Sequence, residues 1–285
     1  MGKRNVRVAA LTAVPMVALA APALADHSWG TYHWQRTSAV ISPPVVTAIT
    51  ANWQANVDEA VDDWNGADVD QIYDDYIESD GPAAAPGVNP KNCRAISGKI
   101  LVCNAKYGFN GWLGVAQIWL SGGHIVQGTT KLNDSYFNTA TYNTYEWKQL
   151  VTCQEIGHDY GLGHQDENFG TDATESCMDY TDRPAGNTSP DKHDYEQLAK
   201  IYGHSHSNFT AVSPGKAGSS AGRPAAALNG AEGGNTPAEW GRAVDSDAHG
   251  RPHLFVQDLG NGNRKITHVF WAVGEGPKGQ QHDDH

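Results

Sequence analysis

The segment CQEIGHDYGLGH, which ends at His164, constrains the fold of this chain more than any other feature. On an α-helix, residues four apart lie on the same face, so Gln154 and His158 can point at one metal ion. The carboxylate of Glu155 would then reach a water bound to that metal without binding the metal itself. Gly161 can end the helix in the left-handed conformation that glycine tolerates, so that His164 returns as a third ligand.

A second segment, Ser-Cys-Met-Asp-Tyr, places Met178 fourteen residues after His164. Together the two segments resemble the metzincin family of zinc endopeptidases, whose signature is HExxHxxGxxH followed by a methionine turn, or Met-turn. The chain matches this signature at Glu155, His158, Gly161, His164 and Met178. It departs from the signature at Gln154, which replaces the first histidine.

The resemblance implies a catalytic Zn²⁺ bound by Gln154, His158 and His164, with Glu155 as the general base. The amide oxygen of Gln154 extends about as far from Cα as the distal ring nitrogen of a histidine, so it can take the same coordination position. Because one neutral ligand replaces another, the zinc would still acidify its bound water, although the amide lowers the affinity for zinc. Tyr180 either binds zinc or supports the transition state, as in some metzincins, or is a packed aromatic side chain of the turn.

These residues predict a zinc-dependent endopeptidase that hydrolyses peptide bonds with a metal-activated water. The alternative is a catalytically inactive scaffold of the same fold that binds peptides or a partner protein. Intact Glu155 favours the enzyme, whereas Gln154 favours the scaffold.

Residues 1–25 have the features of a secretory signal peptide. A basic start precedes a short apolar run from Val8 to Ala21, and Ala23-Leu24-Ala25 forms the expected cleavage site. We therefore expect a secreted, extracellular protein that begins at Asp26 and is active without further cleavage.

The chain is acidic, with a formal net charge of −12 at pH 7. Such a charge gives no attraction to nucleic acid or to an anionic membrane. We expect a monomer, and the resemblance implies protein or peptide substrates as its partners. Acidic residues also gather in the loop 165–175, which is interpreted either as a Ca²⁺ site or as a solvated acidic loop.

The hydrophobic periodicity and the resemblance together predict an α+β fold. The resemblance implies a metzincin-like catalytic domain over residues 26–206, with a twisted mixed five-stranded sheet, an active-site helix, the Met-turn and a C-terminal helix. Helices are expected at 45–64, 142–160 and 191–202, and strands at 29–40, 70–78, 98–107, 111–120 and 124–132.

The strand expected at 111–120 occupies the place where metzincins carry the edge strand that pairs with an extended substrate. An open edge offers backbone donors and acceptors to a peptide. The residues expected to bind substrate in this way are Leu113, Gly114, Val115 and Ala116. An ordinary interior strand is the alternative interpretation.

Four cysteines in an exported chain predict two disulfides, for which three pairings are possible. We expect Cys93 to pair with Cys103 across a short turn. Cys153 would then pair with Cys177 and tie the active-site helix to the Met-turn.

The composition of the chain changes after residue 206. Residues 207–236 are rich in Gly, Ala, Ser and Pro, which predicts a flexible linker. Residues 237–285 regain strand character, and two strand-like segments flank Gly260-Asn261-Gly262-Asn263, which predicts a small β-hairpin tail. So short a segment forms only a marginal core, so the tail either docks on the catalytic domain or is a small accessory module.

Overall fold

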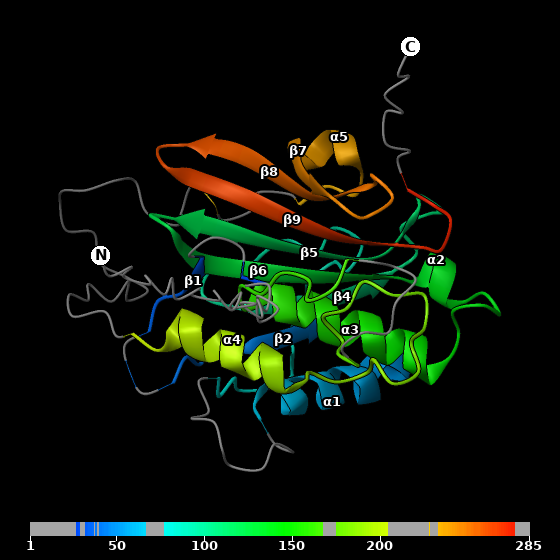
Figure 1. Ribbon diagram of the computed structural model, residues 1–285, viewed down its shortest axis with the longest axis horizontal. Coiled ribbons are helices and arrows are strands. Elements are labelled where there is room, and N and C mark those ends of the chain that lie inside the picture. The colour runs from blue at the N-terminus through cyan, green and yellow to red at the C-terminus, as the bar shows by residue number, and fades with distance from the viewer. Residues whose placement is uncertain are drawn as a thin grey trace, which may run out of the picture.

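A mixed nine-stranded sheet forms the centre of the computed structural model, which describes residues 27–28, 32–36, 38, 40–66, 77–167, 175–204, 228 and 233–276. The strands are β1 (His33–Trp34), β2 (Val45–Ala48), β3 (Ala83–Ala84), β4 (Ile100–Ala105), β5 (Trp112–Ser121), β6 (His124–Asn133), β7 (Arg242–Ser246), β8 (Pro252–Gly260) and β9 (Asn263–Trp271). Their order in the sheet is β3-β2-β4-β6-β5-β9-β8-β7, and β1 adds to β6 (Figure 1). The sheet and its helices give the predicted α+β fold.

The three central strands lie where the sequence predicts them. β4, β5 and β6 are rich in β-branched and aromatic residues, which favour a pleated and buried surface. Gly122 and Gly123 connect β5 to β6 with φ of +60° and +89°, a conformation that glycine adopts without strain. β4 is parallel to β6, whereas β5 is antiparallel to it, so the sheet is mixed.

The helices in the described part of the chain are η1 (Ala51–Trp53), α1 (Gln54–Trp64), α2 (Asp134–Phe137), α3 (Tyr145–Asp159), α4 (Lys192–Tyr202) and α5 (Pro237–Trp240). Helices η1, α1, α3 and α4 lie within the predicted helical segments, whereas α2 and α5 are short helices that were not predicted from the sequence. The prediction of one helix over 45–64 is wrong at its start, because Val45–Ala48 forms β2. These residues pair in parallel with β4, and the buried side chains of Val45 and Val46 suit a strand.

The C-terminal tail joins the main sheet. In it, β8 and β9 form the predicted hairpin, whose turn residues Asn261 and Gly262 both have positive φ, as a two-residue turn requires. β9 then pairs antiparallel with β5 from Trp112, opposite Trp271, to Ser121, opposite Asn263. Of the two alternatives for the tail, the structure shows docking, because β9 pairs with β5 of the preceding part of the chain (Figure 1).

Two expectations about the sheet are corrected by this docking. The sheet has nine strands and not five, and Leu113–Ala116 lie in an interior strand and not at an open edge. The physical reason is that an isolated hairpin is unstable in water, whereas pairing with β5 satisfies its backbone and buries its apolar residues. Trp240, Phe255 and Trp271 form the aromatic contact that accompanies this pairing.

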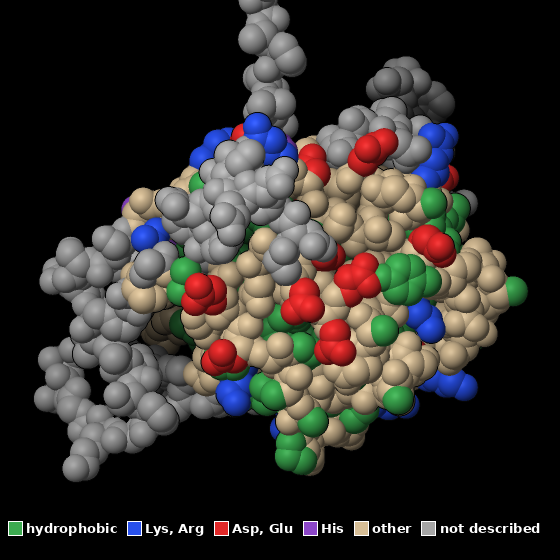
Figure 2. All heavy atoms as spheres, turned by 90° about the horizontal axis from the view of Figure 1, so that it is seen from below, with side chains coloured by type: hydrophobic (Ala, Val, Ile, Leu, Met, Phe, Trp, Pro, Cys, Tyr) green, Lys and Arg blue, Asp and Glu red, His purple; other side chains and the backbone are tan. Residues whose placement is uncertain are grey.

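Acidic side chains predominate on the face of the molecule that carries α1. Figure 2 shows this face, with Asp and Glu side chains spread over it and Lys and Arg side chains mainly at its rim. A surface of this charge favours basic over acidic partners. Within the described part of the chain, no helix is both long enough and apolar enough to span a membrane.

Some of the predicted segments lie outside the described residues. These are the signal peptide 1–25, most of the linker 207–236, most of the strand expected at 70–78, and residues 168–174 of the acidic loop. Of the strand expected at 29–40, the described residues show only the two-residue β1. The interpretations of the acidic loop as a Ca²⁺ site or a solvated loop both stay predictions.

Candidate metal and catalytic site

A glycine-dependent turn after α3 assembles the two candidate histidine ligands. Gly161 follows the helix with φ of +100°, and a Cβ there would lie 2.5 Å from the carbonyl oxygen of Tyr32. Only glycine fits this combination of backbone conformation and close contact. The chain therefore folds back at Gly161 and brings His164 beside His158, as the sequence predicts.

The imidazoles of His158 and His164 approach each other with the geometry of two ligands of one metal. Their Nε2 atoms lie 3.2 Å apart and hydrogen-bond to each other, and this distance is also close to the roughly 3.3 Å that separates two nitrogens bound tetrahedrally to zinc at about 2.0–2.1 Å. The other ring nitrogen of His158, Nδ1, lies 2.8 Å from the carbonyl oxygen of Leu162. That acceptor keeps the proton on Nδ1 and leaves the Nε2 lone pair for a metal. Burial and the neighbouring His164 hold the pKa of His158 well below its usual value, which favours the neutral, ligating form.

The side chain of Gln154 is oriented by residues 176–180, the segment that we call the Met-turn. Its Nε2 donates hydrogen bonds to the carbonyl oxygens of Cys177 at 2.8 Å and Asp179 at 2.7 Å. Its Oε1 is buried and has no hydrogen-bond partner among the described residues. An acceptor left unpaired in the interior is costly, so a cation bound by Oε1 fits this position. This amide oxygen is thus an unpaired acceptor on α3 one helical turn before His158.

Glu155 lies between α3 and the sheet and is fully buried. A Cβ at residue 114 would come within 2.5 Å of its Oε1, so Gly114 makes room for the carboxylate at β5. Burial, with a smaller contribution from Asp159, raises the pKa of Glu155 well above its usual value, while the backbone N–H groups of Ala116 and Phe270 act in the opposite direction. A raised pKa makes this carboxyl group a stronger proton acceptor than a solvated glutamate.

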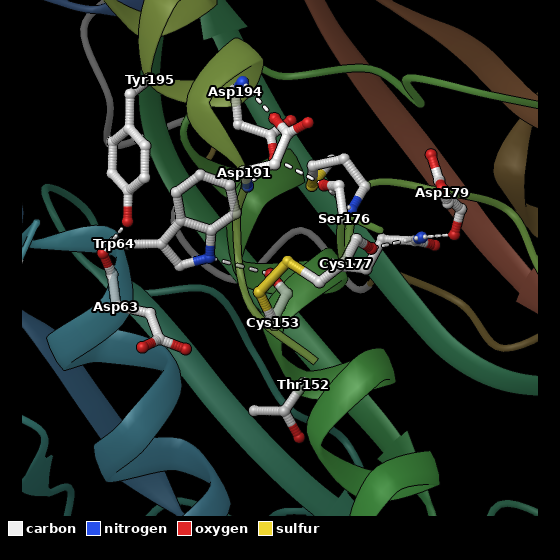
Figure 3. Close-up of a disulfide and its surroundings, with 12 residues drawn as sticks. Asp63, Trp64, Thr152, Cys153, Ser176, Cys177, Asp179, Asp191, Asp194 and Tyr195 are labelled. Carbon is white, nitrogen blue, oxygen red and sulfur yellow. Dashed lines mark hydrogen bonds between the residues drawn. A yellow bond between two sulfur atoms is a disulfide. The ribbon is translucent and has the colours of Figure 1, made fainter. Parts of the chain in front are cut away.

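The Met-turn packs directly beneath α3. A Cβ at Gly157 would lie 2.6 Å from the sulfur of Met178, so the helix and the turn are in close contact. The two segments are also covalently joined, because Cys153 forms a disulfide with Cys177 (Figure 3). Trp64 of α1 adds a hydrogen bond of 2.9 Å from its Nε1 to the carbonyl oxygen of Cys153.

Both predicted disulfides are present in the structure. In addition to the pair in Figure 3, Cys93 is bonded to Cys103, and none of the four cysteines is free. Two disulfides are compatible with an extracellular protein.

Tyr180 lies beside the histidines and contacts the hairpin. Its ring stacks on His164 with centroids 5.2 Å apart, and its hydroxyl accepts a hydrogen bond of 3.1 Å from the backbone N–H of Trp271. Burial raises the pKa of Tyr180 above its usual value, so the hydroxyl keeps its proton. In this form of the protein, Tyr180 is a packed side chain that helps to hold β9.

Two histidines of the tail, which sequence reasoning missed, complete the surroundings of the site. His268 on β9 stacks on His158 with centroids 3.9 Å apart and planes 14° apart. His253 on β8 lies 4.8 Å from His164 between ring centroids, and its Nε2 is 3.2 Å from Oε1 of Glu167. His164, Glu167 and His253 form a second group that could hold a metal. The sequence offers only one hint of this role: each of the two strand-like segments in the tail carries a histidine, His253 and His268.

The hairpin closes the site to solvent. His158, His164 and Glu155 are at most 8% exposed, and His253 and His268 are each 2% exposed. β9 also occupies the side of β5 on which a peptide was expected to pair. A peptide can therefore reach this site only after the hairpin moves.

Comparison with known proteins finds weak likeness, and only among solved structures. No protein-family model matches the sequence, and no curated protein matches it. Among solved structures, the chain is similar to high choriolytic enzyme 1, a hatching-enzyme zinc protease from the medaka fish Oryzias latipes, with a TM-score of 0.30. The identity is 12%, and the match covers 60% of this chain and 94% of that chain. So weak a likeness assigns neither a family nor an activity to this chain.

Proposed function

We propose that the protein is a secreted zinc-dependent endopeptidase of the metzincin type. The observation that supports this most directly is the 3.2 Å approach of the Nε2 atoms of His158 and His164. The unpaired Oε1 of Gln154 supplies a third donor, and the buried carboxyl group of Glu155 follows it on the helix. The amide oxygen of Gln154 and the carboxylate oxygens of Glu155 have no hydrogen-bond partner among the described residues, and buried acceptors of this kind favour a bound ion or water.

Each of these residues has a distinct role in the proposed reaction. The two imidazoles and the amide oxygen of Gln154 would hold the zinc ion. When bound, zinc would polarise the peptide carbonyl and lower the pKa of a water to about 7. Glu155 would take a proton from that water and pass it to the leaving amine, and its raised pKa suits this exchange.

The substrate would be an extended peptide that pairs with β5. β9 already forms an antiparallel ladder with Leu113–Ala116, so the backbone of β5 is suited to hold a strand in that orientation. A substrate would take the place of β9 and lie across Glu155. In this proposal, displacement of the hairpin precedes hydrolysis.

The alternative function is a scaffold that binds peptides or a partner without cleaving them. Two observations favour it: the closed edge of β5, and the use of the Gln154 amide to hold the Met-turn. The buried carboxyl group of Glu155 opposes it, because a scaffold has no need for an acid with a raised pKa at this position.

Cleavage of a mixed peptide library by the zinc-supplemented mature protein in a Trp240→Ala background, which loosens the hairpin, tests the proposal. We expect the Glu155→Gln variant to lose at least about 100-fold in rate, because it cannot accept the proton. Glu146→Gln is the matched control, since Glu146 is an exposed residue of the same helix. Absence of cleavage by the parent, with zinc bound and the hairpin loosened as described in the Discussion, would favour the scaffold.

A further inference from the structure

His164 presents a different nitrogen to each of two groups of ligands. Its Nε2 faces His158 at 3.2 Å, and its Nδ1 faces Oε1 of Glu167 at 3.8 Å. The same carboxylate oxygen lies 3.2 Å from Nε2 of His253 on the hairpin. The ligand atoms of His164, Glu167 and His253 all lie within 4.8 Å of one another, so one ion could contact all three.

The two histidines of this second group are buried and face one carboxylate oxygen. Oε1 of Glu167 is their shared partner in two ion pairs, at 3.8 Å from Nδ1 of His164 and 3.2 Å from Nε2 of His253. Neither contact meets the full geometry of a hydrogen bond among the described residues. Two imidazoles that converge on one carboxylate in this way match the ligand set of a metal ion.

We propose that His164, Glu167 and His253 bind a divalent transition-metal ion that fixes the C-terminal hairpin over the proposed catalytic site. We call this second metal position the bolt. Two imidazoles and one carboxylate form a donor set that zinc takes with an open fourth position. The side chain of Glu167 is 37% exposed, so that fourth position can be filled by water. Because two ligands come from the segment after α3 and one from β8, the ion joins the hairpin to the catalytic part.

The bolt and the proposed catalytic site exclude each other. A neutral imidazole has a single nitrogen with a free lone pair, so His164 can bind an ion through Nδ1 or through Nε2, but not through both. The Nδ1 side offers a carboxylate where the Nε2 side offers an amide oxygen, and zinc prefers the former. In the closed protein the ion therefore binds at the bolt. Movement of the hairpin removes His253 and allows the ion to pass to the Nε2 side, and this last step rests on the proposed function.

Zinc binding to the full mature chain, measured by competition with a chromophoric chelator, tests the bolt. We expect one ion per chain in the parent, and a loss of at least about 100-fold in affinity in His253→Ala and in Glu167→Gln. The second variant changes a part-exposed side chain and keeps its shape, so it tests the ligand without risk to the fold. The control His249→Ala, at an exposed histidine of the turn between β7 and β8, should stay within about threefold of the parent.

Amide hydrogen exchange provides a second reading that does not depend on activity. We expect zinc to slow the exchange of the β9 amides at least about tenfold in the parent, and to have no such effect in Glu167→Gln.

Three outcomes would overturn the bolt in different ways. If His158→Ala loses the ion and His253→Ala keeps it, the ion sits on the Nε2 side, and the proposed function survives without the bolt. If the parent binds zinc with no change in β9 exchange, the ion does not hold the hairpin. If the parent binds no zinc, the bolt and the proposed function both fail.

Discussion

Gln154 combines two roles that a histidine at this position could not fill at once. Its Nε2 donates to the carbonyl oxygens of both Cys177 and Asp179, while its Oε1 stays available to a metal. A histidine that ligates through one nitrogen has only one N–H left to donate. At the proposed metal site, this departure from the metzincin signature would weaken metal binding, while the two hydrogen bonds of the amide strengthen the attachment of the Met-turn.

The substitution Gln154→His tests this trade. We expect zinc affinity on the Nε2 side, measured in a His253→Ala background, to rise at least about tenfold, because imidazole suits zinc better than an amide oxygen does. Without metal, the free energy of unfolding should fall by about 1–3 kcal/mol, because one carbonyl oxygen of the turn loses its donor. Chemical denaturation and chelator competition measure the two effects. An unchanged zinc affinity would mean that residue 154 does not contact the metal.

At the scale of elements, α3 and the Met-turn behave as one unit. Close packing at Gly157, the disulfide from Cys153 to Cys177 and the amide of Gln154 all join the same two segments. The Met-turn is further fixed by Ser176, whose hydroxyl hydrogen-bonds Asp194 next to the α4 N-cap, Asp191 (Figure 3). The proposed ligands Gln154 and His158 on α3 are thus held by contacts between this helix and the Met-turn.

Comparing the removal of each disulfide distinguishes an effect on the metal site from an effect on the stability of the whole protein. We expect the Cys153→Ala/Cys177→Ala and Cys93→Ala/Cys103→Ala double variants each to lose about 3 kcal/mol of unfolding free energy, since both disulfides close loops of moderate length. Only the first pair joins α3 to the Met-turn, so only its loss should lower zinc affinity. Equal zinc affinities in the two variants would contradict this assignment.

Sequence reasoning predicts the elements whose cause is local. The turn at Gly161, the strands on either side of Gly122-Gly123 and the hairpin around Asn261 follow from residues next to one another in the chain. β2 was missed because Val45–Ala48 also fits a helical period, and only its pairing with β4 decides. The roles of His253 and His268 were missed for the same reason, since sheet pairing alone brings them to α3.

Lys265 allows a test of how the hairpin is attached, because it links β9 to the segment that precedes the hairpin. Its ammonium group donates to the carbonyl oxygens of Gly233 at 2.9 Å and Glu239 at 3.1 Å. Burial lowers the pKa of Lys265 from 10.5 to about 8. Between these two pH values the unfolded chain keeps the proton that the folded chain has lost, so the contribution of Lys265 to stability rises with pH. Below pH 8 both states are protonated and this contribution is constant.

The free energy of unfolding of the parent, minus that of Lys265→Met, should therefore be flat from pH 6 to about 8 and increase from there to about pH 10. Urea denaturation at several pH values measures the difference, which cancels the titration of other groups. If this difference in unfolding free energy instead decreases between pH 8 and pH 10, the pKa of Lys265 is raised by folding and not lowered.

For the whole molecule, the hairpin decides whether the site is reachable. Its attachment is extensive: β9 pairs along all of β5, and Trp240 packs against Phe255 and Trp271. Side chains of the central strands reach across as well, as when Lys131 donates to Gly234 and Asn235. Opening is therefore rare in the undisturbed protein, and we expect the intact chain to be a latent enzyme, in contrast to the expectation from sequence.

Loosening the hairpin should release this latency. Trp240→Ala removes the aromatic core of the hairpin at a cost of about 3–5 kcal/mol, so the open form becomes more populated and peptide hydrolysis should rise at least about tenfold. Trp53→Ala is the matched control, because Trp53 is equally buried but packs on Phe137, away from the hairpin. Equal activation by both variants would show that general destabilisation, and not hairpin opening, is the cause.

The position of β7 has a further consequence for how the protein behaves in solution. With the hairpin in place, β7 is the outer strand, and it is short, largely exposed and shifted in register twice against β8, which discourages pairing with another molecule. When the hairpin leaves, the outer strand becomes β5, a run of ten residues without a charged side chain. Such an edge adds strands from any chain that it meets, a second opened copy included. In opened molecules, substrate binding and self-association thus compete for the same edge of β5. We expect the fraction lost to self-association to increase with protein concentration.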